Sequence, residues 1–508
     1  MITWLAGVFE AAASAAPNIV YILADDLGYG DISALNPQGK IKTPQLDQLA
    51  AAGVTFTEAH SSAAVCTPSR YSIITGRYNW RSTLKEGVLG GFAKPLIEPG
   101  RLTVASLLKN HGHKTAYIGK WHLGFEWARL AATNSNEEAK IDFTKPLEHG
   151  PTTSGFDYFY GISASLDMPP YVFIENDHVT ALPTIPRGQL TGADGEVTRP
   201  GPQVPGLTAE EVLPTLTEKA VNYIAQQAGG KHPFFLYVAL TSPHAPFATT
   251  KEWAGKSGLN PYADFVMETD DCIGKILAAL DKNNLSSNTI VMFASDNGCA
   301  PAAHIPFLNE HGHDPDAGRR GHKADIYDGG HRIPLIARWP GHVKAGARSS
   351  DFICLGDLMA TCAELLNEKL PDNAGEDSIS FLPQLVGKQN PNARRVLVET
   401  SNNGSFGLRE GPWKLALCPD SGGWSFPRPG KDNIAGWPRF QLFDLAVDPA
   451  EKTNVMELHP EIVQRLGATM RNYILNGRST PGAPQKNSPV KKWEQTAWLD
   501  QFAPRTQN

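Results

Sequence analysis

The chain has 508 residues, with 46 Lys and Arg against 52 Asp and Glu, and a formal net charge of −6 at pH 7. That weak acidity, spread over a long chain, argues against a nucleic acid as the main partner. The 41% apolar and 9% aromatic fractions exclude an intrinsically disordered protein, and the length predicts roughly two to four domains.

The first segment, residues 1–16, is apolar and ends in small side chains that resemble the cleavage site of an export signal. It lacks the basic start of such a signal, so a cloning or gene-start artefact is the alternative. No apolar run reaches the about eighteen residues that a membrane helix needs, so no membrane span is expected. We therefore expect a periplasmic or secreted protein.

Four continuous apolar runs are each followed by polar residues of unusual chemistry. Such runs predict strands buried on both faces of a sheet, and they cover residues 18–24, 114–119, 233–240 and 289–295. Helical patterns lie between them, over residues 44–52, 104–110, 216–227 and 262–282. This alternation predicts a mostly parallel α/β sheet sandwiched by helices, with the polar strand endings gathered on one edge.

The remaining chain divides into an insertion and an appended unit. Residues 182–207 are rich in Pro and Gly and predict a surface insertion without regular structure. From residue 393, short strand patterns precede one amphipathic helix over residues 460–476, which predicts a small α+β domain (393–508) beside a larger one (17–392). The tryptophans of the smaller domain could form a sugar-stacking wall or its core: Trp413, Trp424 and Trp437.

Two acidic pairs stand at predicted strand ends, Asp25-Asp26 and Asp296-Asn297. Each pair alone is typical of a capping turn. Together, at matching strand ends, they supply three carboxylates and an amide oxygen, the hard ligands that suit Ca²⁺ or Mg²⁺ rather than zinc. The six cysteines are too scattered for a disulfide scaffold or a zinc site.

Three windows together resemble the signatures of the type I, formylglycine-dependent sulfatases of the alkaline phosphatase superfamily. Residues 66–70 read Cys-Thr-Pro-Ser-Arg, which is the Cys-x-Pro-x-Arg core, and precede a helix expected over residues 71–76. Residues 112–122 are similar to the second signature and depart from it only at His113, where the family usually has Tyr or Val. Residues 323–334 are similar to the Lys-containing block, with Asp328 in place of the commoner Glu.

The resemblance implies an alkaline-phosphatase-like fold and hydrolysis of sulfuric esters. It also implies that a formylglycine-generating enzyme converts Cys66 to formylglycine (3-oxoalanine), which would sit hydrated on the metal at a helix N-terminus. The implied Ca²⁺ ligands are Asp25, Asp26, Cys66, Asp296 and Asn297.

The family's catalytic roles carry over onto matching positions of this chain. Asp296 would accept the proton of the attacking oxygen, and cations would stabilise the sulfate oxygens: Arg70, Lys120 and Lys323. His244, with Lys323 beside it, would protonate the leaving alcohol, and His122 would then deprotonate the remaining hydroxyl so that sulfate leaves. Ser165 aligns best with the sulfate-binding serine, with Ser163 as the neighbour that it could be confused with.

Substrate recognition is expected at a rim formed by Asp167, His331 and Arg332. An Asp beside a His and an Arg suits hydrogen bonds to the vicinal hydroxyls of a sugar. For Arg332, an ion pair that joins two loops is the alternative. We therefore predict an exo-acting carbohydrate sulfatase for a terminal sulfated galactose or N-acetylgalactosamine of a polysaccharide.

Two other functions stay open on the sequence. A phosphomonoester or phosphodiester hydrolase of the same superfamily can share the Cys-x-Pro-x-Arg window, and relative rates on an aryl sulfate and an aryl phosphate separate the two. A catalytically silent protein that binds sulfated glycans is the other alternative. The intact set of metal, nucleophile and acid–base residues argues against it, because a binding protein has no need of them.

Overall fold

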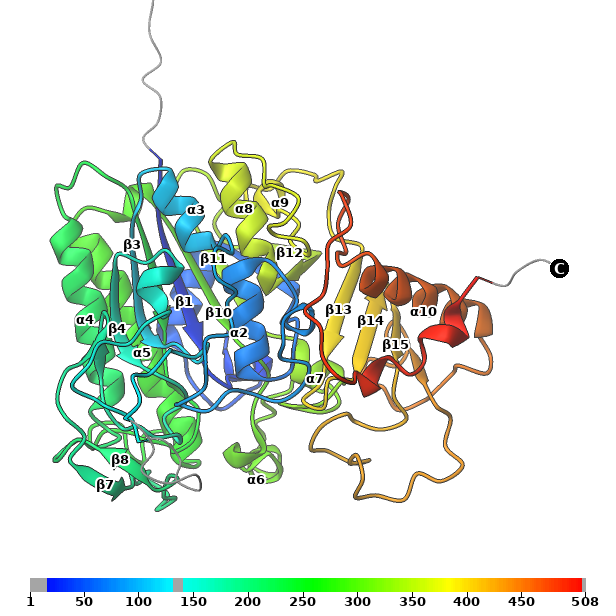
Figure 1. Ribbon diagram of the computed structural model, residues 1–508, viewed down its shortest axis with the longest axis horizontal. Helices are drawn as coiled ribbons and strands as arrows, with labels where there is room; N and C mark the ends of the chain where they lie inside the picture. Colours follow the sequence, from blue (N-terminus) through cyan, green and yellow to red (C-terminus); the bar gives the residue numbers. More distant parts are fainter. Residues whose placement is uncertain (1–15, 131–139, 505–508) are drawn as a thin grey trace, which may run out of the picture.

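The computed structural model describes residues 16–130 and 140–504. In them a ten-stranded sheet flanked by helices lies beside a four-stranded antiparallel sheet near the C-terminus (Figure 1). The expected export signal lies outside the described residues except for its last residue. Among the described residues, no helix has both the length and the apolar character to cross a membrane.

The large sheet has the strand order β12-β2-β11-β10-β1-β9-β3-β4-β5-β6. The run from β10 to β4 is parallel throughout, whereas β11, β5 and β6 pair with antiparallel neighbours. This arrangement confirms the predicted mostly parallel α/β sheet. The strands are β1 (Asn18–Ala24), β2 (Val54–His60), β3 (Lys114–Lys120), β4 (Tyr158–Ile162), β5 (Ile174–Glu175), β6 (His178–Val179), β9 (Phe234–Ala239), β10 (Thr289–Ser295), β11 (Leu335–Arg338) and β12 (Ala347–Cys354).

Helices cover both faces of this sheet. Alternate side chains of β1 enter two separate cores, one shared with α1, α4 and α5 and the other with α2, α3 and α8. The helices are α1 (Pro44–Ala52), α2 (Cys66–Thr75), α3 (Val104–Asn110), α4 (Val212–Gln227), α5 (Pro261–Lys282), α6 (Ile305–Glu310), α7 (Asp328–His331), α8 (Leu358–Leu365), α9 (Leu382–Leu385) and α10 (Pro460–Leu475). The helices expected from residues 44 and 104 match in both bounds, whereas α4 begins at Val212 rather than at residue 216.

The long helix α5 shows how local chemistry sets a boundary. The Asn260 side chain accepts a hydrogen bond from Ala263 N at 3.0 Å, and Pro261 occupies the first turn, where its missing N–H costs nothing. The apolar side chains of α5 are buried, and the helix packs against α1 and α4. Capping and burial therefore agree on where this helix lies.

The composition of the Pro- and Gly-rich insertion led us to expect no regular structure, and this expectation is wrong. It contains the two-stranded antiparallel sheet of β7 (Ile185–Gly188) and β8 (Gly201–Gln203). The register shifts between Ile185 and Gly188, and β7 is largely exposed, so no alternation of apolar and polar residues marks these strands in the sequence.

The smaller sheet is a meander with one helix against it. Its strands are β13 (Val396–Thr400), β14 (Phe406–Glu410), β15 (Trp413–Ala416) and β16 (Gln441–Asp444), and α10 packs on them around a common apolar core. This confirms the predicted antiparallel sheet plus helix. The division between residues 392 and 393 into two domains stays a prediction. All six cysteines are buried and free.

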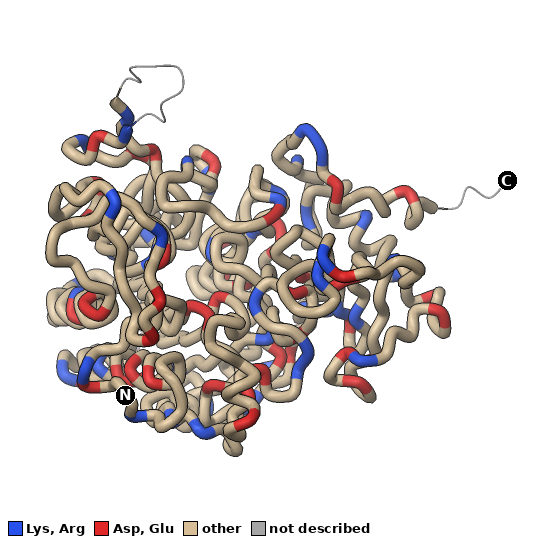
Figure 2. Tube along the Cα trace, turned by 90° about the horizontal axis from the view of Figure 1, so that it is seen from below, with Lys and Arg blue, Asp and Glu red and all other residues tan. Residues whose placement is uncertain are grey.

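Positions of Lys and Arg are interspersed with positions of Asp and Glu along the trace, without a broad region of one sign in this view (Figure 2). A buried cluster of charges instead lies where the two sheets meet. Lys414 Nζ on β15 lies 3.0 Å from Glu399 Oε2 and 3.2 Å from Glu451 Oε1, and His60 Nδ1 on β2 lies 2.9 Å from Glu399 Oε1. These contacts join the small sheet to β2, the second strand from one edge of the large sheet.

Candidate active site

The carboxyl ends of β1, β3, β9 and β10 meet at one edge of the large sheet, as predicted. These strands are parallel neighbours, and Ala24 at the end of β1 lies opposite Ser295 at the end of β10. Parallel pairing therefore brings together residues that are far apart in the chain. They are Asp25 and Asp26 after β1, Lys120 at the end of β3, His244 after β9, and Asp296 and Asn297 after β10.

Cys66 is the first residue of α2, so this helix begins earlier than the expected residue 71. The Cys66 Sγ atom lies 3.5 Å from Asp25 Oδ1 and 4.0 Å from Asp26 Oδ1, at the positive end of the helix dipole. The Cys66 side chain is buried, and burial raises the pKa of its thiol. An unmodified Cys66 is therefore a protonated thiol and a poor nucleophile.

The acidic groups fit a hard cation. Asp25, Asp26, Cys66 and His244 each offer one ligand atom, and these atoms all lie within 4.8 Å of one another. Asn297 Nδ2 donates to Asp26 Oδ1 at 2.7 Å, while its Oδ1 is buried without a hydrogen-bond partner. An orphaned amide oxygen beside buried carboxylates matches the donor set of Ca²⁺.

Three cations face the three carboxylates. Lys120 Nζ lies 2.5 Å from Asp25 Oδ2, and Lys323 Nζ lies 2.6 Å from Asp26 Oδ2. Arg70 Nη2 donates to Asp296 Oδ2 at 2.7 Å. Each charge-assisted contact offsets part of the cost of burying both ions.

Burial and these contacts shift the pKa values of two of the carboxyl groups in opposite directions. Burial opposes ionisation of Asp25, but Lys120 and other cations outweigh it and hold the pKa of Asp25 well below its usual range. Burial and the nearby charge of Asp25 raise the pKa of Asp296 to about 7, although Arg70 lowers it. Of the two carboxyl groups, Asp296 is therefore the one whose protonated form burial and the charge of Asp25 favour.

The ring of His122 binds a backbone carbonyl through one nitrogen only. Its Nε2 lies 2.7 Å from the carbonyl oxygen of Leu89, which can only accept, so Nε2 carries the proton and Nδ1 does not. Nδ1 is buried without a partner, and the residue lines the cavity. Burial, then Lys120 and Arg70, hold the pKa of His122 well below its usual range, so the ring is neutral.

His244 binds a backbone carbonyl through Nδ1, whereas His122 does so through Nε2. Its Nδ1 donates to the carbonyl oxygen of Ala245 at 2.5 Å, and its Nε2 lies 3.5 Å from Asp26 Oδ2 and 3.3 Å from Ser165 Oγ. Lys120 Nζ donates to Ser165 Oγ at 3.2 Å. The structure thus brings Ser165 to the cavity, whereas Ser163 does not line it.

A cavity of about 270 Å³ opens beside these groups. Asp167 lines it, with Oδ1 buried and unpartnered and Oδ2 3.2 Å from Arg199 Nη2. The sequence did not predict Arg199 as a site residue, because it belongs to the insertion and no local pattern marks it. Trp424, which the sequence left open between wall and core, also lines the cavity.

The expectation that His331 and Arg332 reach the same rim is wrong. His331 is fully buried, with Nδ1 3.3 Å from Ser61 O, and Arg332 Nη1 lies 2.5 Å from Glu58 Oε1. Helix α7 directs the chain back onto β2, where Ser61 N donates to His331 O. Both residues therefore belong to the buried charged cluster between the sheets.

His331 should make the protein acid-sensitive. Burial lowers its pKa from 6.5 to about 4, so between these values the unfolded chain binds a proton that the folded protein does not. The free energy of unfolding should fall as the pH drops through this window, by about 3 kcal/mol from this ring. Urea titrations from pH 7 to pH 4 should give a shallower pH dependence for His331→Asn; an unchanged pH dependence would contradict the assignment.

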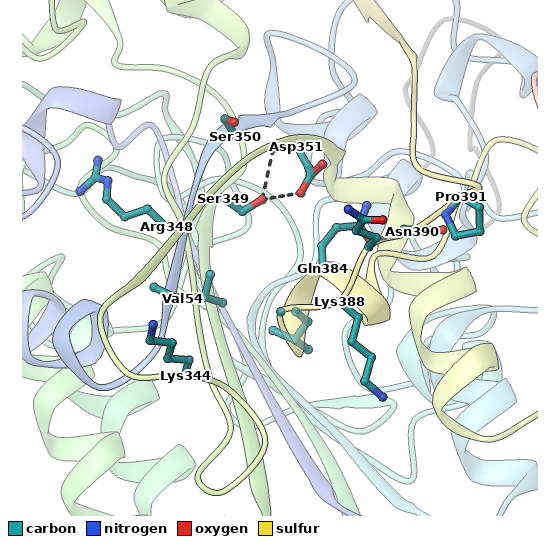
Figure 3. A pocket seen from close by; sticks show the side chains of 14 residues that line it. Val54, Lys344, Arg348, Ser349, Ser350, Asp351, Gln384, Lys388, Asn390 and Pro391 are labelled. Carbon is teal, nitrogen blue, oxygen red and sulfur yellow. Dashed lines mark hydrogen bonds between the residues drawn. The ribbon is translucent and has the colours of Figure 1, made fainter.

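A wider hollow of about 860 Å³ lies between β12 and α9 (Figure 3). It is lined by the exposed cation Arg348, by Lys344 and Lys388, and by Ser349, whose Oγ donates to Asp351 Oδ2 at 2.6 Å. None of the predicted catalytic residues lines it. The chemistry therefore belongs to the smaller cavity.

Known proteins match the chain over most of its length. The family described as Sulfatase matches residues 17–368. The chain is 33% identical over 496 residues to an N-acetylgalactosamine-6-O-sulfatase of Bacteroides thetaiotaomicron, covering 90% of this chain and 93% of that protein. It is 30% identical over 476 residues to arylsulfatase A of Homo sapiens, covering 90% and 87%.

A solved structure agrees with these sequence matches. It comes from a study of the metabolism of multiple glycosaminoglycans by Bacteroides thetaiotaomicron, and it shares 32% identity and a TM-score of 0.78. The alignment covers 90% of this chain and 99% of that one. Together with the family match over residues 17–368, this places the chain in the sulfatase family, whose members hydrolyse sulfuric esters.

Proposed function

We propose that this protein is a Ca²⁺-dependent carbohydrate sulfatase that removes a 6-O-sulfate from a terminal sugar of galactose or N-acetylgalactosamine type. The observation that carries the proposal is the placement of Cys66 at the start of α2, against Asp25 and Asp26 and beside two buried lysines. The sugar and the sulfate position are supported by the name of the Bacteroides relative. We also propose that the protein acts in the periplasm or outside the cell, where polysaccharides are met.

The site fits both groups that the family implies. Ca²⁺ would be held by the oxygens of Asp25, Asp26, Asp296 and Asn297 together with the group at position 66, and it would stabilise negative charge there. Formylglycine, made from Cys66 by a formylglycine-generating enzyme, would supply the oxygen nucleophile that the buried thiol does not.

The side chains around this position divide the remaining work. The positive charges of Arg70, Lys120 and Lys323 lie around the site and would stabilise the oxygens of a bound sulfate. His122 Nδ1 carries no proton and can take one up, and His244 can donate one from Nε2 to a leaving alcohol when both of its ring nitrogens are protonated. We assign the base role to His122, whose ring is held neutral because burial, Lys120 and Arg70 lower its pKa. We assign the acid role to His244, whose Nε2 lies 3.5 Å from Asp26 Oδ2 and 3.3 Å from Ser165 Oγ.

Sugar recognition is assigned to Asp167. Its Oδ1 atom is buried without a partner on the cavity wall, and such an acceptor is costly unless a ligand donates to it. A sugar hydroxyl would satisfy it, whereas an aryl ring would not. A cavity of about 270 Å³ also suits a single terminal residue, which agrees with exo action.

Asp167→Ala should therefore lower kcat/KM for a sulfated sugar more than for an aryl sulfate, by about tenfold for one hydrogen bond to a charged group. Sulfate release from N-acetylgalactosamine 6-sulfate and from an aryl sulfate measures the ratio. Arg199→Ala is the matched variant, because it removes the ion pair and leaves the acceptor in place. Equal losses on both substrates for Asp167→Ala would make this residue structural.

The function itself is tested by a panel of defined sulfated mono- and oligosaccharides, read out as released sulfate, with an aryl phosphate alongside. We expect the highest kcat/KM on a terminal 6-sulfated hexosamine. Faster turnover of the phosphate would indicate the phosphoesterase alternative. Tight binding of sulfated sugars without turnover, by protein shown to be fully converted at position 66, would indicate a binding protein.

A further inference from the structure

Exposed aromatic side chains are concentrated between β15 and β16. Among the described residues, four Phe or Trp side chains are exposed, and one of them, Phe307, lies elsewhere in the chain. The other three are Trp424, Phe426 and Trp437, with exposed fractions of 47%, 63% and 44%. Trp424 lines the cavity, and the rings of Phe426 and Trp437 lie 6.1 Å apart. A group of exposed aromatic rings that starts at a binding cavity is typical of an interaction surface.

The backbone beneath Trp424 is firmly anchored. Trp424 N and Ser425 N both donate to Asp325 Oδ1, at 2.8 and 3.0 Å. Gly423 packs so closely that a Cβ atom there would lie 2.4 Å from the carbonyl carbon of Ala324. The backbone that carries the exposed ring is thus fixed next to the loop of Lys323, so little backbone freedom is lost when a ligand covers the ring.

The cavity has room for one sugar. Its volume of about 270 Å³ lies below the roughly 300–1,000 Å³ of common ligand pockets, and the space beside Cys66 and Lys323 is needed for the sulfate. A second sugar of a longer substrate must therefore lie beyond the cavity. Trp424 offers the apolar part of that outer wall.

The same segment is suited to an acidic polysaccharide. Arg428, Lys431 and Arg439 are exposed on it, while Asp432 is paired with Arg428 at 3.2 Å. Positive charge next to aromatic rings complements sugar chains that carry sulfate or carboxylate groups along their length.

We propose that Trp424 is a stacking platform for the sugar that follows the terminal sulfated residue. Pyranose rings present apolar C–H faces that pack on aromatic rings while their hydroxyls remain hydrated. The platform makes the enzyme select sulfated oligosaccharides over monosaccharides. This inference rests on the proposed function, because it requires a carbohydrate in the cavity.

The test compares kcat/KM of the fully converted enzyme for N-acetylgalactosamine 6-sulfate and for a tetrasaccharide that carries this residue at its non-reducing end. Trp424→Ala should lower the value for the tetrasaccharide about tenfold more than that for the monosaccharide, mainly through KM. Trp424→Phe should recover most of the preference. Phe307→Ala, which removes an exposed ring outside the cavity wall, is the matched control.

The outcomes separate the platform from the function. Equal losses on both substrates for Trp424→Ala, or no loss on either, would overturn the platform while the proposed function stands. A wild-type enzyme that releases sulfate from an aryl sulfate but from neither sugar would overturn both. If Phe307→Ala also lost the tetrasaccharide preference, the platform would be overturned, because the loss would then not be specific to Trp424.

Discussion

Replacing Cys66 by Ala should reduce sulfate release to background, a loss of at least about 10⁴-fold, because the variant lacks the nucleophile. Wild-type protein in which Cys66 remains a thiol should be equally inactive. Burial raises the pKa of this thiol, and a soft sulfur atom is a poor ligand for a hard cation. Activity should therefore rise in proportion to the fraction of chains converted to formylglycine.

Mass spectrometry of the tryptic peptide that contains Cys66 measures that fraction on the same preparations used for the assays. Cys362→Ala is the control, since Cys362 is also fully buried but lies on α8, within an apolar core. It should retain activity even if stability falls slightly. Full activity from protein whose Cys66 is entirely thiol would disprove the mechanism.

The second large effect is expected at His244. His244→Ala should lower turnover of sulfated sugars by ~10²–10⁴-fold, because a sugar alcohol is a basic leaving group that needs a proton. Activated aryl sulfates leave without that help, so their loss should be much smaller. The Nδ1 contact with Ala245 O holds the ring so that Nε2 faces Asp26 and Ser165, and the doubly protonated ring would donate from Nε2.

Asp296→Ala provides the comparison. Asp296 is paired with Arg70 and contributes to the oxygen cluster, so both substrate types should lose activity alike. Rates on a sugar sulfate and on an aryl sulfate, measured for both variants, give the pattern. Equal losses on the two substrates for His244→Ala would argue against its role as an acid.

Much of the fold could be predicted from short segments. The strands β1 and β10 match their expected bounds, since a continuous apolar run is a local signal of a strand buried on both faces. The two-stranded sheet in the insertion could not be predicted, because its few pairs are exposed and irregular. The start of α2 was placed too late, because residues 66–70 carry no apolar period that marks a helix.

For the site, the sequence by itself determined the chemistry at the sheet edge. The rule that parallel strands share a carboxyl edge placed Lys120 with Asp25 and Asp296, and the resemblance of contiguous motifs to the sulfatase signatures added Cys66 and Lys323. Only the tertiary structure decided the rim. Arg199 and Trp424 reach the cavity, whereas Arg332 is buried in ion pairs, because loop paths depend on packing between segments distant in the chain and leave no local periodic signal.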